Sequence, residues 1–252
     1  MTPRFSCALN GVTPESIDPA LRVTDLTELP SRRRVATLPT TRHGLRLLRR
    51  VRESITVRVS FIIPVYDPAQ RRALLQKLHA WGDPGGLLTT SDRLGQQLRV
   101  VCDTLPMLSA LSWLDEIHME FTAYAPPFWE LTEETAVTTI GAATLMLPGD
   151  AEDVPVACEV TNLGDDPLTT LTITCGNTHM TFSGLAIAPG GVFRLWEEDG
   201  LLHATDGAAS LLMHRTPDSS DLLLADGGRA AALLVSGDQP VEATFHARGR
   251  LL

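Results

Sequence analysis

Residues 54–81, SITVRVSFIIPVYDPAQRRALLQKLHAW, join the clearest strand of this chain to its clearest helix. From Ile55 to Ile63, apolar side chains occupy every second position, which is the pattern of a half-buried strand. Asp67 then supplies a helix N-cap, and Pro68 stands at the first helical position. Apolar residues recur at helical spacing from there to Trp81 and stop at Gly82. The stretch therefore predicts a strand followed by a helix over residues 68–81.

Strand-like segments follow this helix. A Gly85-Gly86 turn leads into LLTT, residues 96–104 read QQLRVVCDT, and residues 112–124 alternate between apolar and polar side chains. The order of strand, helix and several antiparallel strands predicts an α+β domain whose helix covers one face or edge of the sheet. The pattern of residues 1–39 is too irregular to assign strands there.

After residue 130 the chain alternates short strand-like segments with turn signals, at the spacing of a sandwich or barrel. The expected strands are residues 144–147, 154–161, 168–175, 178–182, 191–196, 201–205, 222–225, 230–235 and 239–247. Gly, Asn and Asp fill the gaps between them, as hairpin turns require. Residues 131–252 are therefore expected to form an all-β domain, most simply an antiparallel sandwich. The fold class expected for the whole chain is mainly β, with one helix in the first domain.

The border between the two expected domains is marked by residues 123–130, AYAPPFWE. Pro126 and Pro127 have no backbone donors and end any strand ladder before them. The charge balance also changes here: up to Glu130 there are 16 Lys and Arg against 13 Asp and Glu, and beyond it 5 against 17. We expect domains at 1–130 and 131–252. The expected domain junction consists of Tyr124, Pro126, Pro127, Phe128 and Trp129.

Composition limits the class of protein. Of the 252 residues, 44% are hydrophobic and 20% are charged, and no apolar run approaches the ~18 residues of a membrane span. The N-terminus lacks the apolar core of a signal peptide, so we expect the chain to be made and kept in the cytosol. The four cysteines form no CxxC pair and are expected to be free thiols.

No pattern points to catalysis. The seven histidines lack the spacing of a metal site, and neither a GxSxG elbow nor a phosphate-binding loop occurs. The acidic residues after Trp196 suit a charged hairpin tip better than a glycosidase pair. We expect no catalytic, metal or cofactor site and no enzymatic activity. The enzymatic alternative is a glycan hydrolase built on a β-sandwich, which turnover of a glycan would reveal.

Arginines gather at residues 32–34 and 42–52. Such a run fits either a solvated strand and loop or a contact with an acidic partner. No aromatic residues interleave with the arginines as stacking platforms, so nucleic-acid binding is not expected.

The order of these elements resembles the distal tail proteins of siphophages, the phage tail component family. The resemblance is carried by residues 44–63, 66–68, 80–81, 85–86, 98–100 and 121–130, and it covers the first 130 residues as a succession of elements. Beyond residue 130 the β pattern is similar in kind to the galectin-like domain of that family.

The resemblance implies a structural virion protein without catalysis. It implies that the first domain forms a ring of six copies that joins the tail tube to the tip and adsorption apparatus, and that assembly takes place in the host bacterial cytoplasm. Tail tube protein, tail-tip proteins and a receptor-binding protein or host glycan are the implied partners. The candidate ring or tube contact consists of Arg42, Arg46, Arg49, Arg50 and Arg52. The alternative is an oligomeric carbohydrate-binding or receptor-binding adaptor, in which Trp196 is the candidate ligand platform.

Overall fold

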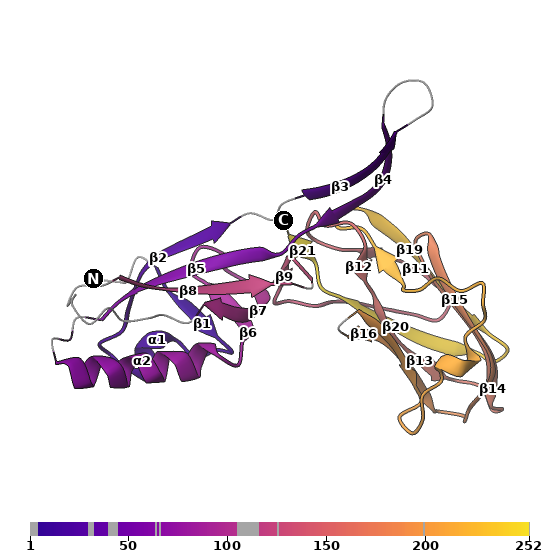
Figure 1. Cartoon of the computed structure of the whole chain (residues 1–252). Coiled ribbons are helices and arrows are strands. Elements are labelled where there is room, and N and C mark those ends of the chain that lie inside the picture. Colours follow the sequence, from indigo (N-terminus) through magenta and orange to yellow (C-terminus); the bar gives the residue numbers. More distant parts are fainter. Residues whose placement is uncertain are drawn as a thin grey trace. The chain divides into compact units, whose positions relative to one another are not determined.

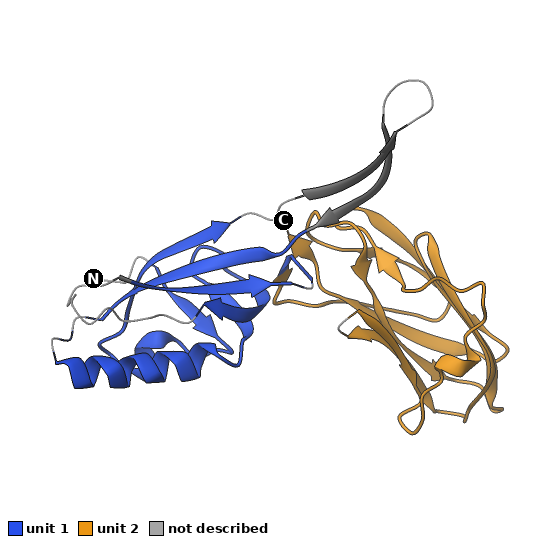
Figure 2. Cartoon of the chain, in the orientation of Figure 1, with its two compact units in different colours: residues 1–129 blue, residues 130–252 orange. Residues whose placement is uncertain are grey.

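The computed structural model divides the chain between Trp129 and Glu130 into two compact units (Figure 2). It describes residues 5–29, 33–39, 45–63, 65, 67–104, 116–124, 126–198 and 200–251, and it describes the backbone alone for residues 33–39, 45–52 and 116. The division lies one residue before the boundary that the sequence suggests. Each unit is described here by itself.

The first unit contains one main antiparallel sheet and two helices (Figure 1). The strand order is β1-β6-β7-β8-β5-β2. These strands are β1 (Cys7–Leu9), β2 (Arg22–Leu29), β5 (Ile55–Ile62), β6 (Gly86–Thr90), β7 (Gln96–Thr104) and β8 (Glu116–Ala123); the helices are α1 (Pro14–Ile17) and α2 (Pro68–Gly82). The predicted strand and helix of residues 54–81 are thus confirmed as β5 and α2.

Helix α2 covers one face of this sheet (Figure 1). Its N-cap Asp67 accepts a hydrogen bond from the Ala69 N–H, and Pro68 occupies the first turn, as the sequence indicates. The helix buries Trp81, whose ring meets those of Phe61 and Phe121 edge-on, with centroids 6.2 and 5.7 Å away. Because the apolar stripe of α2 fills this face, the helix and sheet form one core.

Two further strands of the first unit, β3 (Arg33–Pro39) and β4 (Leu45–Arg52), form a two-stranded antiparallel sheet of their own. We call this pair the arginine hairpin. The strand β9 (Trp129–Leu131) spans the division between the units. In residues 5–29, where the sequence allowed no assignment, the structure contains β1, α1 and β2.

The second unit is a sandwich of two antiparallel sheets. The five-stranded sheet has the order β10-β20-β13-β16-β17, the four-stranded sheet has the order β11-β19-β14-β15, and β12 pairs with β18. The strands are β10 (Thr135–Thr139), β11 (Ala142–Met146), β12 (Val154–Pro155), β13 (Ala157–Asn162), β14 (Leu168–Cys175), β15 (Thr178–Ile187), β16 (Val192–Glu198), β17 (Leu201–Thr205), β18 (Leu224–Ala225), β19 (Ala230–Gly237), β20 (Val241–Ala247) and β21 (Arg250–Leu251), with a 3₁₀ turn at Leu212–His214.

The core of this sandwich is apolar. Phe182 of β15 and Phe193 of β16 meet across the two sheets with ring centroids 4.9 Å apart, and Phe245 of β20 is fully buried with them. Burial alternates along β13, β14, β19 and β20, so each strand gives one face to this core. The predicted mainly-β, antiparallel fold class is confirmed.

Several strand ends are shifted, most of all in β15, which continues to Ile187 where the sequence suggested residue 182, and two further details differ from the expected strands. The segment 154–161 was expected to be one strand, but it divides at Val156 into β12 and β13, which pair with different neighbours. Pro155 lacks a backbone donor, which explains a break at this place. The strand β10 has no counterpart among the expected strands.

No helix in the described part of the chain is long and apolar enough to cross a membrane.

Candidate functional site

The candidate contact arginines belong to the arginine hairpin, except Arg42, which lies outside the described residues. The backbone register places Arg52 opposite Arg33 and Arg50 opposite Val35, so β3 and β4 bring two arginine-rich segments alongside each other. Residues 32–52 contain eight arginines and no carboxylate. The hairpin therefore concentrates positive charge, and its role as an interface stays a prediction.

Of the expected junction residues, Trp129 has the most extensive contacts. Its side chain is 1% exposed, and its Nε1–H donates to Glu28 Oε2 at 3.2 Å. The Arg93 guanidinium lies over the ring, 5.3 Å from its centroid, and donates to both oxygens of Glu28 at 2.9 and 3.0 Å. These three residues, which we call the Trp129 cluster, all lie in the first unit. Sequence reasoning missed Glu28 and Arg93.

The other junction residues are less buried. Tyr124 is 61% exposed and its hydroxyl donates to the Asp103 carboxylate at 2.9 Å, a hydrogen bond that raises the pKa of Tyr124. Pro126, Pro127 and Phe128 are half-buried. The proline pair follows the end of β8 at Ala123, as expected from its missing donors. The role of these residues as a domain junction stays a prediction.

The candidate platform Trp196 lies on β16, opposite His203 of β17. The two rings stack with centroids 5.1 Å apart and an interplanar angle of 14°. Trp196 is half-buried, and His203 occupies one face of its indole. A sugar ring would have only the other face available for stacking.

The arginines of the second unit are all engaged by carboxylates of the same unit. Each of the five lies within 3.9 Å of a carboxylate oxygen. The pairs are Arg194 with Glu159, Arg215 with Asp221, Arg229 with Asp226, Arg248 with Glu134, and Arg250 with Glu130. Because 18 Asp and Glu belong to residues 130–252, most carboxylates of this unit have no cation partner of their own.

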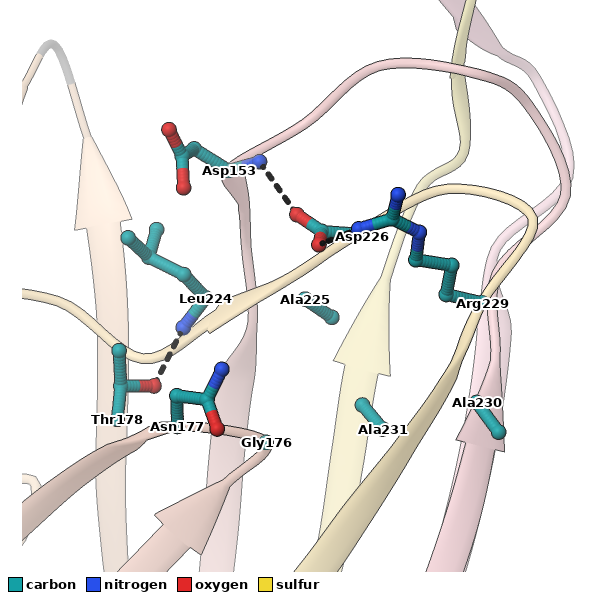
Figure 3. Close-up of a pocket in the computed structure, with 10 residues that line it drawn as sticks. All are labelled: Asp153, Gly176, Asn177, Thr178, Leu224, Ala225, Asp226, Arg229, Ala230 and Ala231. Atoms are coloured by element: carbon teal, nitrogen blue, oxygen red, sulfur yellow. Dashed lines mark hydrogen bonds and ion pairs between the residues drawn. The ribbon is translucent and has the colours of Figure 1, made fainter.

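One cavity of about 300 Å³ lies in the second unit beside the turn between β14 and β15 (Figure 3). The Asp153 N–H donates to Asp226 Oδ1 at 3.2 Å, and Arg229 faces the other oxygen of Asp226 at 3.4 Å. No aromatic side chain lines this cavity. Asp226 and Arg229 at its rim pair with each other, and the cavity gives no sign of a particular ligand.

The cysteine thiols of the described chain are poor nucleophiles. Burial raises the pKa of Cys7 to about 12 and that of Cys175 to about 11, and it raises the pKa of Cys158 as well. All four cysteines are free. Within the described residues, no group of three or more His, Cys, Asp or Glu side chains is arranged to hold a metal ion.

Comparison with known proteins gives matches among solved structures alone. Neither a family model nor a curated protein sequence matches the chain. The crystal structure of the Dit protein of phage SPP1, described as a paradigm of the hub adsorption apparatus in phages that infect Gram-positive bacteria, matches with a TM-score of 0.72 and 10% sequence identity. The match covers 97% of this chain and 98% of that chain.

Two baseplate structures of phage P2 in its activated conformation, with Ca and with Sr, match with TM-scores of 0.48 and 0.44. Both are 6% identical and cover 97% of each chain. The SPP1 protein combines near-complete coverage with a TM-score of 0.72, and the chain therefore has the fold of the SPP1 Dit protein over nearly its whole length.

Proposed function

We propose that this chain is a structural protein of a phage tail tip or baseplate, and that six copies form a ring that joins the tail tube to the adsorption apparatus. The observation that carries the proposal is the likeness to the SPP1 hub protein over both units, in the same order along the chain. A likeness confined to one sandwich would be common among unrelated proteins. The order and spacing of motifs in the first 130 residues, found without the structure, support the same assignment.

The arginine hairpin is the proposed ring or tube contact. A two-stranded sheet is marginal on its own in water, so it gains stability when it packs against a partner. Arginines recognise carboxylates through planar, bidentate hydrogen bonds. The segment 32–52, with eight arginines and no carboxylate, therefore fits an acidic surface on a neighbouring copy or on the tail tube.

This function requires binding and no catalytic or cofactor site. The acidic second unit is proposed to lie at the outside of the ring, because like charges on six copies repel one another and favour separation. The protein would be assembled in the host cytoplasm and would remain in the virion tail, with tail tube and tail-tip proteins as its neighbours.

A charge reversal of the hairpin tests the proposal. We expect the full chain to give rings in electron micrographs and a mass near six times that of the monomer by native mass spectrometry. The triple variant Arg46→Glu, Arg49→Glu, Arg50→Glu should release single copies or smaller assemblies, because it replaces attraction by repulsion at the contact.

The matched control changes three exposed arginines elsewhere in the first unit: Arg22→Glu, Arg72→Glu and Arg99→Glu. It alters the net charge by the same amount and should leave the ring intact. Loss of the ring in both variants would point to net charge instead of the hairpin, and an intact ring in the first variant would remove the hairpin from the contact.

A further inference from the structure

On one side of the sandwich in the second unit the edge strands are covered by another segment of the chain, and on the other side, within the described residues, they are not. Each sheet has two edge strands: β10 and β17 in the five-stranded sheet, β11 and β15 in the four-stranded sheet. An edge strand presents backbone N–H and C=O groups to which another chain can add.

On the side of β15 and β17, the segment 206–221 of the chain itself covers both edges. At β17, the Leu211 N–H donates to Ala204 O at 2.8 Å, and Ser210 forms a bridge with Thr205. The segment thus adds backbone partners along an edge that would otherwise be open.

At β15 the cover is more complete. The Thr216 N–H donates to Thr181 O at 2.9 Å, and the Ser220 N–H donates to His179 O at 2.8 Å. In return, the hydroxyls of Ser219 and Ser220 accept from the N–H groups of Thr181 and His179 at 3.0 and 3.1 Å. At His179 and Thr181, both the donor and the acceptor of this edge are satisfied within the unit.

The opposite side, formed by β10 and β11, has no such cover among the described residues. In that part of the chain, β11 has β19 as its one strand neighbour. Residues 135–149 contain no charged residue, β11 contains no proline, and its register with β19 runs without a bulge. Charge, proline and bulges are the usual devices that protect an edge. Ile140 and Met146 are 76% and 57% exposed on this side.

The hydrogen-bond pattern shows which backbone groups of β11 are available. Opposite residues of an antiparallel pair alternate between hydrogen-bonded and non-bonded pairs. The Val235 N–H donates to Gly141 O at 2.9 Å, and the register continues from there as Ala142 opposite Leu234. The bonded positions are therefore Gly141, Ala143 and Leu145. The N–H and C=O groups of the alternate positions Ala142, Thr144 and Met146 point away from β19, toward the open edge.

We infer that this open edge is where two copies of the chain meet, with β11 pairing antiparallel to β11 of the second copy about a two-fold axis at Thr144. In this register Thr144 faces its own equivalent and Ala142 faces Met146, so every outward N–H and C=O of β11 gains a partner. This inference goes beyond the ring, which is assigned to the first unit.

A second copy is favoured as the occupant for two reasons. Within the described part of the second unit, the β15 and β17 edges are covered, so the β10–β11 side is the sheet edge that this unit offers another copy, and identical antiparallel strands match about a two-fold axis. Since residues 135–149 carry no charge, the two edges meet without opposed carboxylates, although the unit as a whole is acidic.

Cysteine cross-linking tests the register directly. Thr144→Cys is introduced into the full chain in a Cys102→Ser background, because Cys102 is the half-exposed cysteine and the other three are buried. Equivalent Cα atoms in a bonded antiparallel pair lie ~5.5 Å apart, within the range that a disulfide spans. With oxidised glutathione, Thr144→Cys should give covalent dimers.

The matched control is Ala232→Cys, on β19 directly opposite Thr144 and equally exposed, but one strand farther from the axis. It should remain uncross-linked. Absence of dimers with Thr144→Cys, or equal cross-linking at both positions, would overturn the inference. Absence of dimers would also make an extended segment of a different protein the candidate partner of the β11 edge.

A second measurement separates this contact from the ring. Thr144→Pro removes a donor at the open edge without removing a bond to β19, and it should halve the mass of the largest assembly seen by native mass spectrometry. Thr144→Val keeps the donor and should leave the mass unchanged. An unchanged mass in Thr144→Pro would overturn the inference whether or not rings form, whereas the hairpin variant above tests the ring alone.

Added salt should strengthen the proposed β11 edge contact and weaken the proposed arginine hairpin contact. Added salt screens repulsion between the acidic units, so the fraction cross-linked through Thr144→Cys should rise with ionic strength. A contact of arginines with carboxylates should weaken under the same conditions. A cross-linked fraction that falls with salt would contradict edge pairing.

Discussion

The two units differ in how their basic residues are distributed. In the first unit, eight of the 16 basic residues lie between residues 32 and 52, a segment without a carboxylate. In the second unit each of the five arginines lies beside a carboxylate of the same unit, and the surplus is acidic. The first unit thus has a local excess of positive charge in residues 32–52, which the proposed contact would use, whereas the second unit pairs its arginines with its own carboxylates.

The units also differ in the polarity of their interiors. In the Trp129 cluster of the first unit, the ion pair of Arg93 and Glu28 contacts a buried indole, and the two side chains are 26% and 23% exposed. The core of the second unit around Phe182, Phe193 and Phe245 is apolar. Stability of the first unit should therefore depend in part on this ion pair, and that of the second mainly on the packing of its apolar core.

The largest effect is expected for Trp129→Ala. Loss of a buried aromatic side chain costs about 3–5 kcal/mol, and this loss should fall on the first unit because both polar partners of Trp129 lie there. Calorimetry of the full chain should show the unfolding of the first unit shifted to lower temperature and that of the second unit unchanged. Trp129→Phe, which keeps an aromatic ring, should lose less. If neither unit lost stability while the two moved more freely, Trp129 would instead act as part of the domain junction expected from the sequence.

A smaller effect is expected for Glu28→Gln. The change leaves the Arg93 guanidinium without its carboxylate in a mostly buried place, which should cost about 1–3 kcal/mol in the free energy of unfolding of the first unit. Glu120→Gln, which breaks the more exposed pair with Arg58 in the same unit, is the control and should cost less than about 1 kcal/mol. Equal losses in urea unfolding would show that the Trp129 cluster gains nothing from its burial.

For Arg194→Gln in the second unit, we expect a change of no more than about 0–1 kcal/mol. The Arg194 and Glu159 side chains are 47% and 50% exposed, so water screens their attraction. Chemical unfolding of the second unit measures this effect. A loss as large as that of Glu28→Gln would contradict the contrast between the two units.

The smallest effect concerns acid stability. Asp238 accepts hydrogen bonds from Thr169 and Thr170, and these bonds lower the pKa of Asp238 below its ordinary value of 3.8. Because the folded state lowers this pKa, the contribution to stability is complete above 3.8 and is lost as the pH falls through the lowered pKa. The midpoint of unfolding of the second unit should thus fall less between about pH 5 and pH 2 in Asp238→Asn than in the original chain. Parallel curves would mean that Asp238 does not stabilise this turn.

Elements that depend on local pattern could be predicted from the sequence. The strand β5 alternates in its apolar residues, α2 has its cap and proline in place, and β14 and β17 begin and end where the pattern predicts. The strand β10, TAVTT, could not be predicted, because it has one strong apolar residue and no alternation of strong contrast.

Contacts between distant residues could not be predicted either. Trp129 and Glu28 are 101 positions apart, and no local signal connects them. The cover of the β15 edge depends on the hydroxyls of Ser219 and Ser220. No pattern in the sequence marks these two serines, because their partners His179 and Thr181 are distant along the chain and only the fold brings them together. The positive charge of residues 32–52 could be predicted from the sequence, whereas the pairing of β3 with β4 as a separate hairpin could not.

Electron microscopy of the Thr144→Pro full chain is the most direct test of the hub assignment, because this variant removes the proposed edge pairing and leaves the ring contact untouched. We expect class averages with six-fold symmetry, formed by the first units. Single copies without rotational symmetry at the same concentration, unchanged on addition of a tail tube protein, would contradict the hub assignment.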